Sequence, residues 1–145
     1  MQVFLDTSVI VAASESSHPH HALALPVLRR VANDQDQGFI GAHSIAETYA
    51  ALTRLPVQPR IHPSEAGRII RENILKHFKL VAAGEAEYLQ ALTAVQDAGW
   101  PGAKIYDALL LACAARSGAE RIYTFNLGDF RGLAQAELQA RICSP

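Results

Sequence analysis

Short apolar runs alternate with longer helical segments along this chain. The runs predict strands at positions 2–5, 38–41, 78–82 and 121–124, with a further edge strand at 140–142. Helical spacing predicts helices at positions 9–13, 20–32, 44–55, 63–77, 85–98 and 104–117. Strands that alternate with helices in this way are joined by βαβ crossovers, so the pattern predicts an α/β protein with a mainly parallel sheet.

Several helix ends carry local signals. Thr7 and Ser8 are predicted to cap the first helix. Ser44 is followed by Glu47 at the spacing of a capping box, and Gly118 stands where a helix commonly ends. The segment at Asp129 is predicted to begin only a short last turn.

The length predicts a single domain over residues 1–145. Half of the 145 residues are apolar, which is enough for a hydrophobic core at this size. The segment Leu55–Pro63 contains three prolines and predicts a loop between helices, not a domain boundary.

The net charge of −1 gives no strong overall attraction to nucleic acid. Cys113 lies in an apolar helical run and predicts a buried small side chain, not a disulfide. No basic segment precedes the apolar start, and Asp6 interrupts it, so we expect no signal peptide, no membrane span and a cytoplasmic location.

Four carboxylates, Asp6, Glu47, Asp107 and Asp129, occupy equivalent places in this pattern, after a predicted strand or in the first turns of a helix. In a parallel sheet these places meet at the carboxyl edge of the strands, where ligands bind. Like charges gathered there repel one another unless a cation holds them. Oxygen ligands without His or Cys suit Mg²⁺ or Mn²⁺, which can polarise a phosphodiester and activate water. The remaining charges, ten acidic against thirteen basic, would permit a polyanionic substrate.

Each carboxylate also has a purely structural interpretation. Asp6 could be a turn residue that caps the next helix. Glu47 could be the second half of the Ser44 capping box. Asp107 could be a first-turn acid stabilised by the helix dipole and by Lys104, three residues before it.

Other residues near these positions could assist the site. Asn126 could supply a neutral oxygen to the metal, and Thr124 could hold a neighbouring carboxylate by a hydrogen bond. Lys104 and Arg131 lie close in sequence to the acidic segments and are predicted to contact the substrate backbone.

Two further features leave alternatives open. The histidines at positions 18, 20 and 21 could bind a soft metal, but a flexible polar loop is the simpler interpretation. Trp100 could stack on a nucleic-acid base or pack within its loop.

Four segments together resemble the PIN domain. They are Leu-Asp-Thr-Ser-Val-Ile-Val from Leu5, Ser-Ile-Ala-Glu-Thr from Ser44, Tyr-Asp-Ala-Leu-Leu-Leu-Ala from Tyr106 and Thr-Phe-Asn-Leu-Gly-Asp-Phe from Thr124. In length and motif order the chain is similar to the VapC-type toxins of bacterial toxin–antitoxin systems, and the likeness spans Val3–Phe130.

The resemblance implies a three-layer α/β/α sandwich around a sheet of four or five strands. It also implies an endoribonuclease that depends on Mg²⁺ or Mn²⁺, usually forms a homodimer and is silenced by a small cognate antitoxin. By this match Asp6, Glu47 and Asp107 correspond to three acidic ligands. The fourth acidic place falls to Asn126 or Asp129, because many relatives have Asp where this chain has Asn126.

Two other functions are consistent with the sequence. The neutral Asn126 and the low overall basicity would suit a non-catalytic binding or regulatory module on the same scaffold. Asp6 could be the nucleophile of an aspartyl-phosphate enzyme, although Ser8 stands where such enzymes usually have a second Asp. A dinucleotide-binding domain is disfavoured because no Gly-x-Gly-x-x-Gly follows the first strand.

Overall fold

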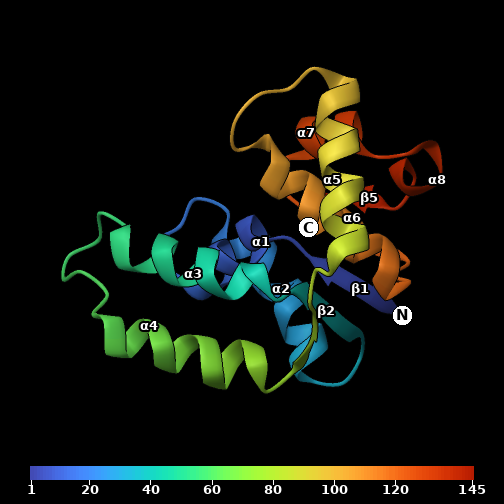
Figure 1. The fold of residues 1–145 in the computed structure, drawn as a ribbon. Helices are drawn as coiled ribbons and strands as arrows, with labels where there is room; N and C mark the ends of the chain where they lie inside the picture. The colour runs from blue at the N-terminus through green and yellow to red at the C-terminus, as the bar shows by residue number, and fades with distance from the viewer.

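The computed structural model describes residues 1–145 and contains a five-stranded sheet between two layers of helices (Figure 1). All neighbouring strands are parallel, in the order β3-β2-β1-β4-β5. The strands are β1 (Gln2–Leu5), β2 (Gln37–Gly41), β3 (Phe78–Val81), β4 (Arg121–Tyr123) and β5 (Ile142–Cys143). This arrangement confirms the predicted α/β/α fold class.

Eight α-helices connect and cover the strands. They are α1 (Thr7–Ser14), α2 (His21–Ala32), α3 (His43–Arg54), α4 (Pro63–Ile69), α5 (Glu85–Ala98), α6 (Lys104–Ser117), α7 (Leu127–Leu133) and α8 (Ala136–Gln139). The predicted helix 63–77 is instead α4 followed by a π-helical segment, η1 (Ile70–Leu75).

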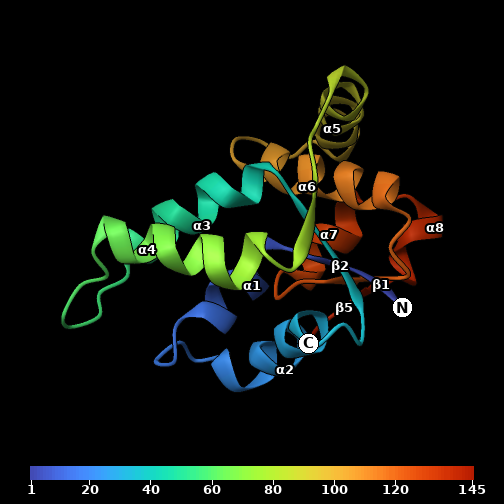
Figure 2. The same cartoon turned by 90° about the horizontal axis from the view of Figure 1, so that it is seen from below.

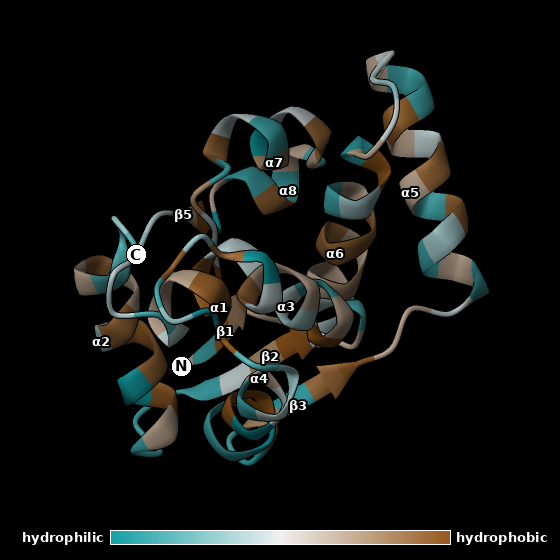
Figure 3. Ribbon diagram, turned by 90° about the vertical axis from the view of Figure 1, so that its left-hand side faces the viewer, coloured by the Kyte–Doolittle hydropathy of each residue, from teal (hydrophilic) through white to brown (hydrophobic).

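The central strand β1 is buried on both faces. Phe4 points into a core formed mainly by α5, α6 and α7, whereas Val3 and Leu5 point into a second core with α1 and α2. Figure 2 shows α2 on one side of the strands and α5 and α6 on the other. In Figure 3 apolar residues colour the ends of β2 and β3 brown, while polar residues mark outer turns of α5. A strand with a continuous apolar sequence is typical of such a covered parallel sheet.

Helices α3 and α4 form an arm that extends from the sheet, at the left of Figure 1. A small third cluster, Val11, Leu52, Ala66 and Ile69, joins this arm to α1. The loop between α3 and α4 lies where the prolines predicted it. No helix in the structure has the length and apolar composition that a membrane crossing requires.

Two of the predicted caps are wrong. The first helix begins at Thr7, so Asp6 occupies the N-cap position, and its side chain makes no capping hydrogen bond. Helix α3 begins at His43, so Ser44 lies inside the helix and the predicted box with Glu47 does not form. The hydroxyls of Thr7, Ser8 and Ser44 form hydrogen bonds with side chains at the carboxyl ends of the strands instead of capping their helices.

Candidate active site

The carboxyl edge of the sheet holds a polar cavity of about 610 Å³. Asp6, Glu47, Asp107 and Asn126 all line it, so the fold brings these residues together from four separate segments. We call this cavity the acidic pocket. A cavity of similar size between α5 and α7, about 570 Å³, contains only one carboxylate, Asp97, and has no comparable group of polar side chains.

Asp6 lies at the end of β1 and is 3 % exposed. Ser8 Oγ donates a hydrogen bond to Asp6 Oδ2 (2.7 Å), and Thr124 Oγ1 donates to the same oxygen (2.9 Å). The Asn126 backbone N–H in turn donates to Thr124 Oγ1 (2.9 Å), and the Phe125 N–H donates to Ser8 Oγ (3.2 Å). This chain of hydrogen bonds fixes one carboxylate oxygen and ties the β4–α7 connection to the start of α1.

Glu47 lies one helical turn inside α3 and faces α1. The Thr7 hydroxyl donates to Glu47 Oε1 (3.1 Å) and lies 3.0 Å from the Ser44 hydroxyl. His43 Nε2 is 3.9 Å from the same Glu47 oxygen. The residues predicted as caps, Thr7 and Ser44, therefore orient Glu47.

The ionised forms of the three pocket carboxylates are destabilised by burial and by their mutual repulsion. Burial raises the pKa of Asp6 above its ordinary value, and the hydroxyls of Ser8 and Thr124 oppose this shift. Burial also raises the pKa of Glu47, and the charge of Asp6 adds to this shift. Burial first, and then the charges of Asp6 and Asp129, raise the pKa of Asp107 to about 6. A cation in the pocket would offset this repulsion.

Asp129 does not line the acidic pocket. Its carboxylate accepts a hydrogen bond from the Lys104 ammonium in an ion pair, and this contact raises the pKa of Lys104. The sequence suggested Lys104 as a partner for Asp107 in the same helix turn, whereas the structure pairs it with Asp129 of α7. Asp129 remains close enough for its charge to act on Asp107.

Arg131 does not line the acidic pocket and instead contacts β5. Its guanidinium donates to the Ile142 carbonyl (3.1 Å) and so ties α7 to β5. Cys113 is buried in the core as predicted. Trp100 packs against Gly132 of α7, in accordance with the loop-packing alternative.

Asp6, Glu47, Asp107 and Asn126 offer oxygen ligands, while His18 and His20 also line the pocket. No three His, Cys, Asp or Glu side chains converge closely enough to surround one ion by themselves. This arrangement suits Mg²⁺ or Mn²⁺ better than zinc, because Mg²⁺ keeps several waters and uses only one or two carboxylates together with substrate oxygens.

The sequence did not predict the two stacked pairs of aromatic rings beside the pocket. His20 stacks on Phe125 (ring centroids 4.5 Å apart), and His43 stacks on Tyr106 (5.4 Å). Tyr106 directly precedes Asp107, so the sequence alone indicates that Tyr106 lies near the pocket. The pairing of His20 with Phe125 had no local signal, because the two residues lie 105 positions apart in the sequence.

Comparisons with known proteins identify a matching family and several relatives. The family model described as PIN domain matches residues 3–135. Ribonuclease VapC27 of Mycobacterium tuberculosis is 30% identical over 116 residues, which cover 80% of this chain and 79% of that protein. Ribonuclease VapC40 of the same species is 31% identical over 115 residues, covering 79% of this chain and 80% of that protein.

The fold is also similar to solved structures. The crystal structure of M. tuberculosis VapC20, described as a Sarcin-Ricin loop cleaving toxin, superposes with a TM-score of 0.69 at 20% identity. The match covers 93% of this chain and 97% of that one.

Proposed function

Because this chain belongs to the PIN domain family, we propose that it is an endoribonuclease that hydrolyses RNA phosphodiester bonds with the help of Mg²⁺ or Mn²⁺. The observation that carries the proposal is the acidic pocket, where three partly or fully buried carboxylates converge and no Lys or Arg lines the cavity. The relatives named as ribonucleases support the reaction class.

Asp6, Glu47 and Asp107 would hold the metal, some of them through its bound waters because no three of these side chains surround one point, and Asn126 would be a neutral fourth partner. When bound, such an ion polarises the phosphodiester and lowers the pKa of an attacking water. Asp129 is engaged by Lys104, which favours Asn126 for the fourth place. These roles fit a metal site in which water and substrate oxygens fill the coordination positions that the protein leaves open.

The other polar residues position this site. Ser8 and Thr124 hold Asp6 Oδ2, so that Oδ1 is left for the metal, and Thr7 orients Glu47. Lys104, with 43% of its side chain exposed beside Asp107 and Asp129, is suited to contact a substrate phosphate. Arg131 points toward β5, so its predicted contact with substrate is the weaker of the two.

We further propose that residues 1–145 fold as a single PIN domain and act in the cytoplasm as the toxin of a toxin–antitoxin pair. As the resemblance to VapC-type toxins implies, its partners would be a second copy of the chain in a homodimer and a small cognate antitoxin.

The decisive experiment compares the purified chain with Asp6→Asn on RNA in the presence of Mg²⁺ or Mn²⁺. We expect the wild type to cleave and the variant to lose more than about 100-fold in rate, because it loses a metal ligand. Circular dichroism checks that the variant is folded, and Asp97→Asn, an exposed acid outside the pocket, is the matched control. Cleavage that continues in EDTA, or an active Asp6→Asn, contradicts the proposal.

A non-catalytic binding module is the second candidate. The neutral Asn126 and the pairing of Asp129 with Lys104 favour this candidate, because they leave only three acidic residues to bind metal. Calorimetry separates the two functions: a binding module shows no heat of Mg²⁺ or Mn²⁺ binding at millimolar concentration.

A further inference from the structure

The acidic pocket lies between two stacked aromatic pairs. The first pair, His20 and Phe125, lines the pocket itself, with ring centroids 4.5 Å apart and planes tilted by 18°. The second pair, His43 and Tyr106, has centroids 5.4 Å apart and planes tilted by 12°. Both geometries are those of offset-stacked rings.

Sheet topology places the pairs on opposite sides of Asp6. Asp6 ends β1, the central strand, while Phe125 follows β4 and His43 follows β2. Strands β2 and β4 both neighbour β1, so the two pairs are separated by about two strand spacings, roughly 10 Å. Each pair is also fixed to the site by the chain, since Phe125 precedes Asn126 and Tyr106 precedes Asp107.

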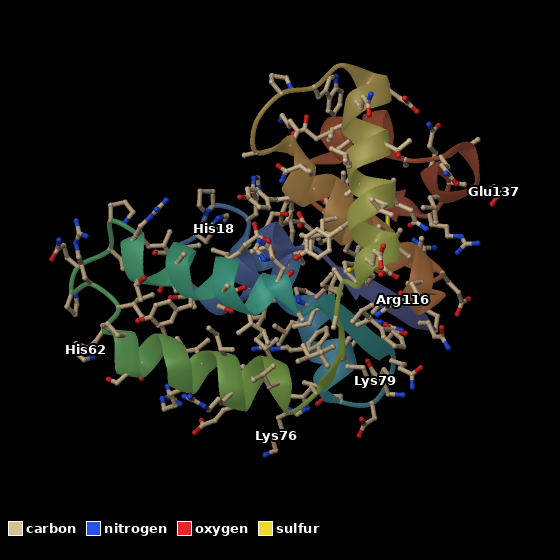
Figure 4. The ribbon with its side chains drawn as sticks, viewed as in Figure 1. His18, His62, Lys76, Lys79, Arg116 and Glu137 are labelled. Carbon is tan, nitrogen blue, oxygen red and sulfur yellow. The ribbon has the colours of Figure 1, made fainter.

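In each pair at least one ring is available to a ligand. His20 is exposed, while Phe125 is half-buried against the α1–α2 core and holds the imidazole in place. Tyr106 is 47% exposed, and 37% of the His43 side chain is exposed. His18, labelled in Figure 4 on the loop between α1 and α2, lies next to the first pair, with its ring centroid 5.8 Å from that of His20.

On the premise of the proposed function, we propose that these two pairs are base-stacking platforms that position the nucleotides on either side of the scissile phosphate. Aromatic faces bind unpaired bases of any sequence, and RNA enzymes commonly recognise bases splayed out of a helix in this way. The net charge of −1 supports this role, because a chain with so little positive charge gains little affinity from phosphate contacts. His20 and Tyr106 are thus positioning residues and do not act on the reacting bond.

The test uses single-stranded RNA oligonucleotides labelled with fluorescein, with binding measured in EDTA and cleavage measured in Mn²⁺. We expect His20→Ala and Tyr106→Ala each to raise Kd and KM about 5- to 100-fold, with a much smaller effect on kcat, because each removes one stacked base. His20→Phe and Tyr106→Phe keep an aromatic face and should restore most of the affinity.

Two matched controls lie far from the acidic pocket. His77→Ala changes a histidine that precedes β3, at the opposite edge of the sheet. Tyr88→Ala changes an exposed tyrosine near the start of α5, at the end of the α5–α6 pair distant from Tyr106. Neither control should change Kd or KM.

The outcomes distinguish this inference from the proposed function. If the wild type cleaves RNA but both alanine variants keep its Kd and KM, base stacking is wrong and the nuclease stands. If the phenylalanine variants lose as much affinity as the alanine variants, the contacts are polar and the inference is again overturned. A chain that binds no RNA overturns both proposals.

Discussion

At the scale of single residues, Asp107 combines partial burial with three neighbouring negative charges, those of Asp6, Asp129 and Glu47. We therefore expect Asp107→Asn to stabilise the metal-free chain at pH 7, by about 1–2 kcal/mol, because it removes a charge that burial and repulsion disfavour. Thermal unfolding in EDTA measures this gain. Catalytic sites commonly hold such destabilising residues.

The same variant also tests metal binding without an activity assay. In millimolar Mg²⁺ or Mn²⁺ the wild type should gain stability by binding the ion, and Asp107→Asn should gain much less. Asp97→Asn, on the exposed side of α5, should behave as the wild type in both conditions. A wild type that is as stable as Asp107→Asn in EDTA would show that the pocket carboxylates do not repel one another.

The sequence predicts the members of the acidic pocket better than their partners. Asp6, Glu47 and Asp107 follow from the rule that strand ends and helix starts meet at one sheet edge, and the structure places them together. The pairing of Lys104 with Asp129 could not be read from the chain, because it depends on how α7 packs against α6. A side chain has several partners within reach, and only the tertiary arrangement selects one.

At the scale of elements, β2 passes so close to its neighbours that Gly38 has no room for a side chain. An added Cβ would lie 2.5 Å from Val31 Cγ1 and 2.6 Å from the Phe78 ring. Since Val31 is β-branched and both neighbours are buried, we expect Gly38→Ala to cost about 1–3 kcal/mol of unfolding free energy. Gly128→Ala in α7, where nothing lies within 4 Å, is the control and should be neutral or slightly stabilising. Urea unfolding compares the two variants, and equal stability would contradict the close approach.

The connection from α2 to β2 is held by an ion pair. Arg30 donates from Nε to Asp36 Oδ2 (2.6 Å) and from a terminal nitrogen to Oδ1 (3.2 Å), and this contact lowers the pKa of Asp36. A lowered carboxyl pKa contributes stability above the ordinary Asp value, near pH 4, and that contribution is lost as the pH falls through the lowered pKa. We expect Asp36→Asn to be about 1–2 kcal/mol less stable than the wild type at pH 7, with the difference shrinking below about pH 4.

Unfolding in urea at a series of pH values measures this difference. Asp34→Asn is the control, because Asp34 is exposed and lies outside the ion pair. If the free energies of unfolding of the wild type and of Asp36→Asn differ by the same amount at pH 7 and at pH 3, the charge of Asp36 is not the cause of the stability difference.

Helices with strong local signals are predicted well, and helices formed by packing are not. Helix α6 has the predicted bounds because a long apolar run ends at Gly118, whose φ of 74° suits glycine. Helix α7 spans Leu127–Leu133, where the sequence predicts only a short turn, and it contains two glycines, which disfavour a helix. It forms because burial of Phe130 and Leu133 against the core outweighs this low propensity.

At the scale of the whole molecule, β1 contributes side chains to two hydrophobic cores on opposite faces of the sheet. Phe4 belongs to the core with α5 and α6, and its neighbours Val3 and Leu5 belong to the core with α1 and α2. Loss of either core therefore exposes one face of the same strand. This sharing predicts that the chain unfolds as one cooperative unit, as expected for a single domain.

Trp100, the only tryptophan, reports on the first core, whereas Ile10 is fully buried in the second. We expect Ile10→Ala to lower the free energy of unfolding by about 2–5 kcal/mol and to shift the Trp100 fluorescence midpoint in urea together with the far-UV circular dichroism midpoint. The control Leu92→Ala, at an exposed position of α5, should shift neither signal appreciably. If Ile10→Ala moves the dichroism midpoint but leaves the Trp100 midpoint in place, the two sides of the sheet unfold separately. In that case β1 does not couple them, and Asp6 at its end would be held by one core alone.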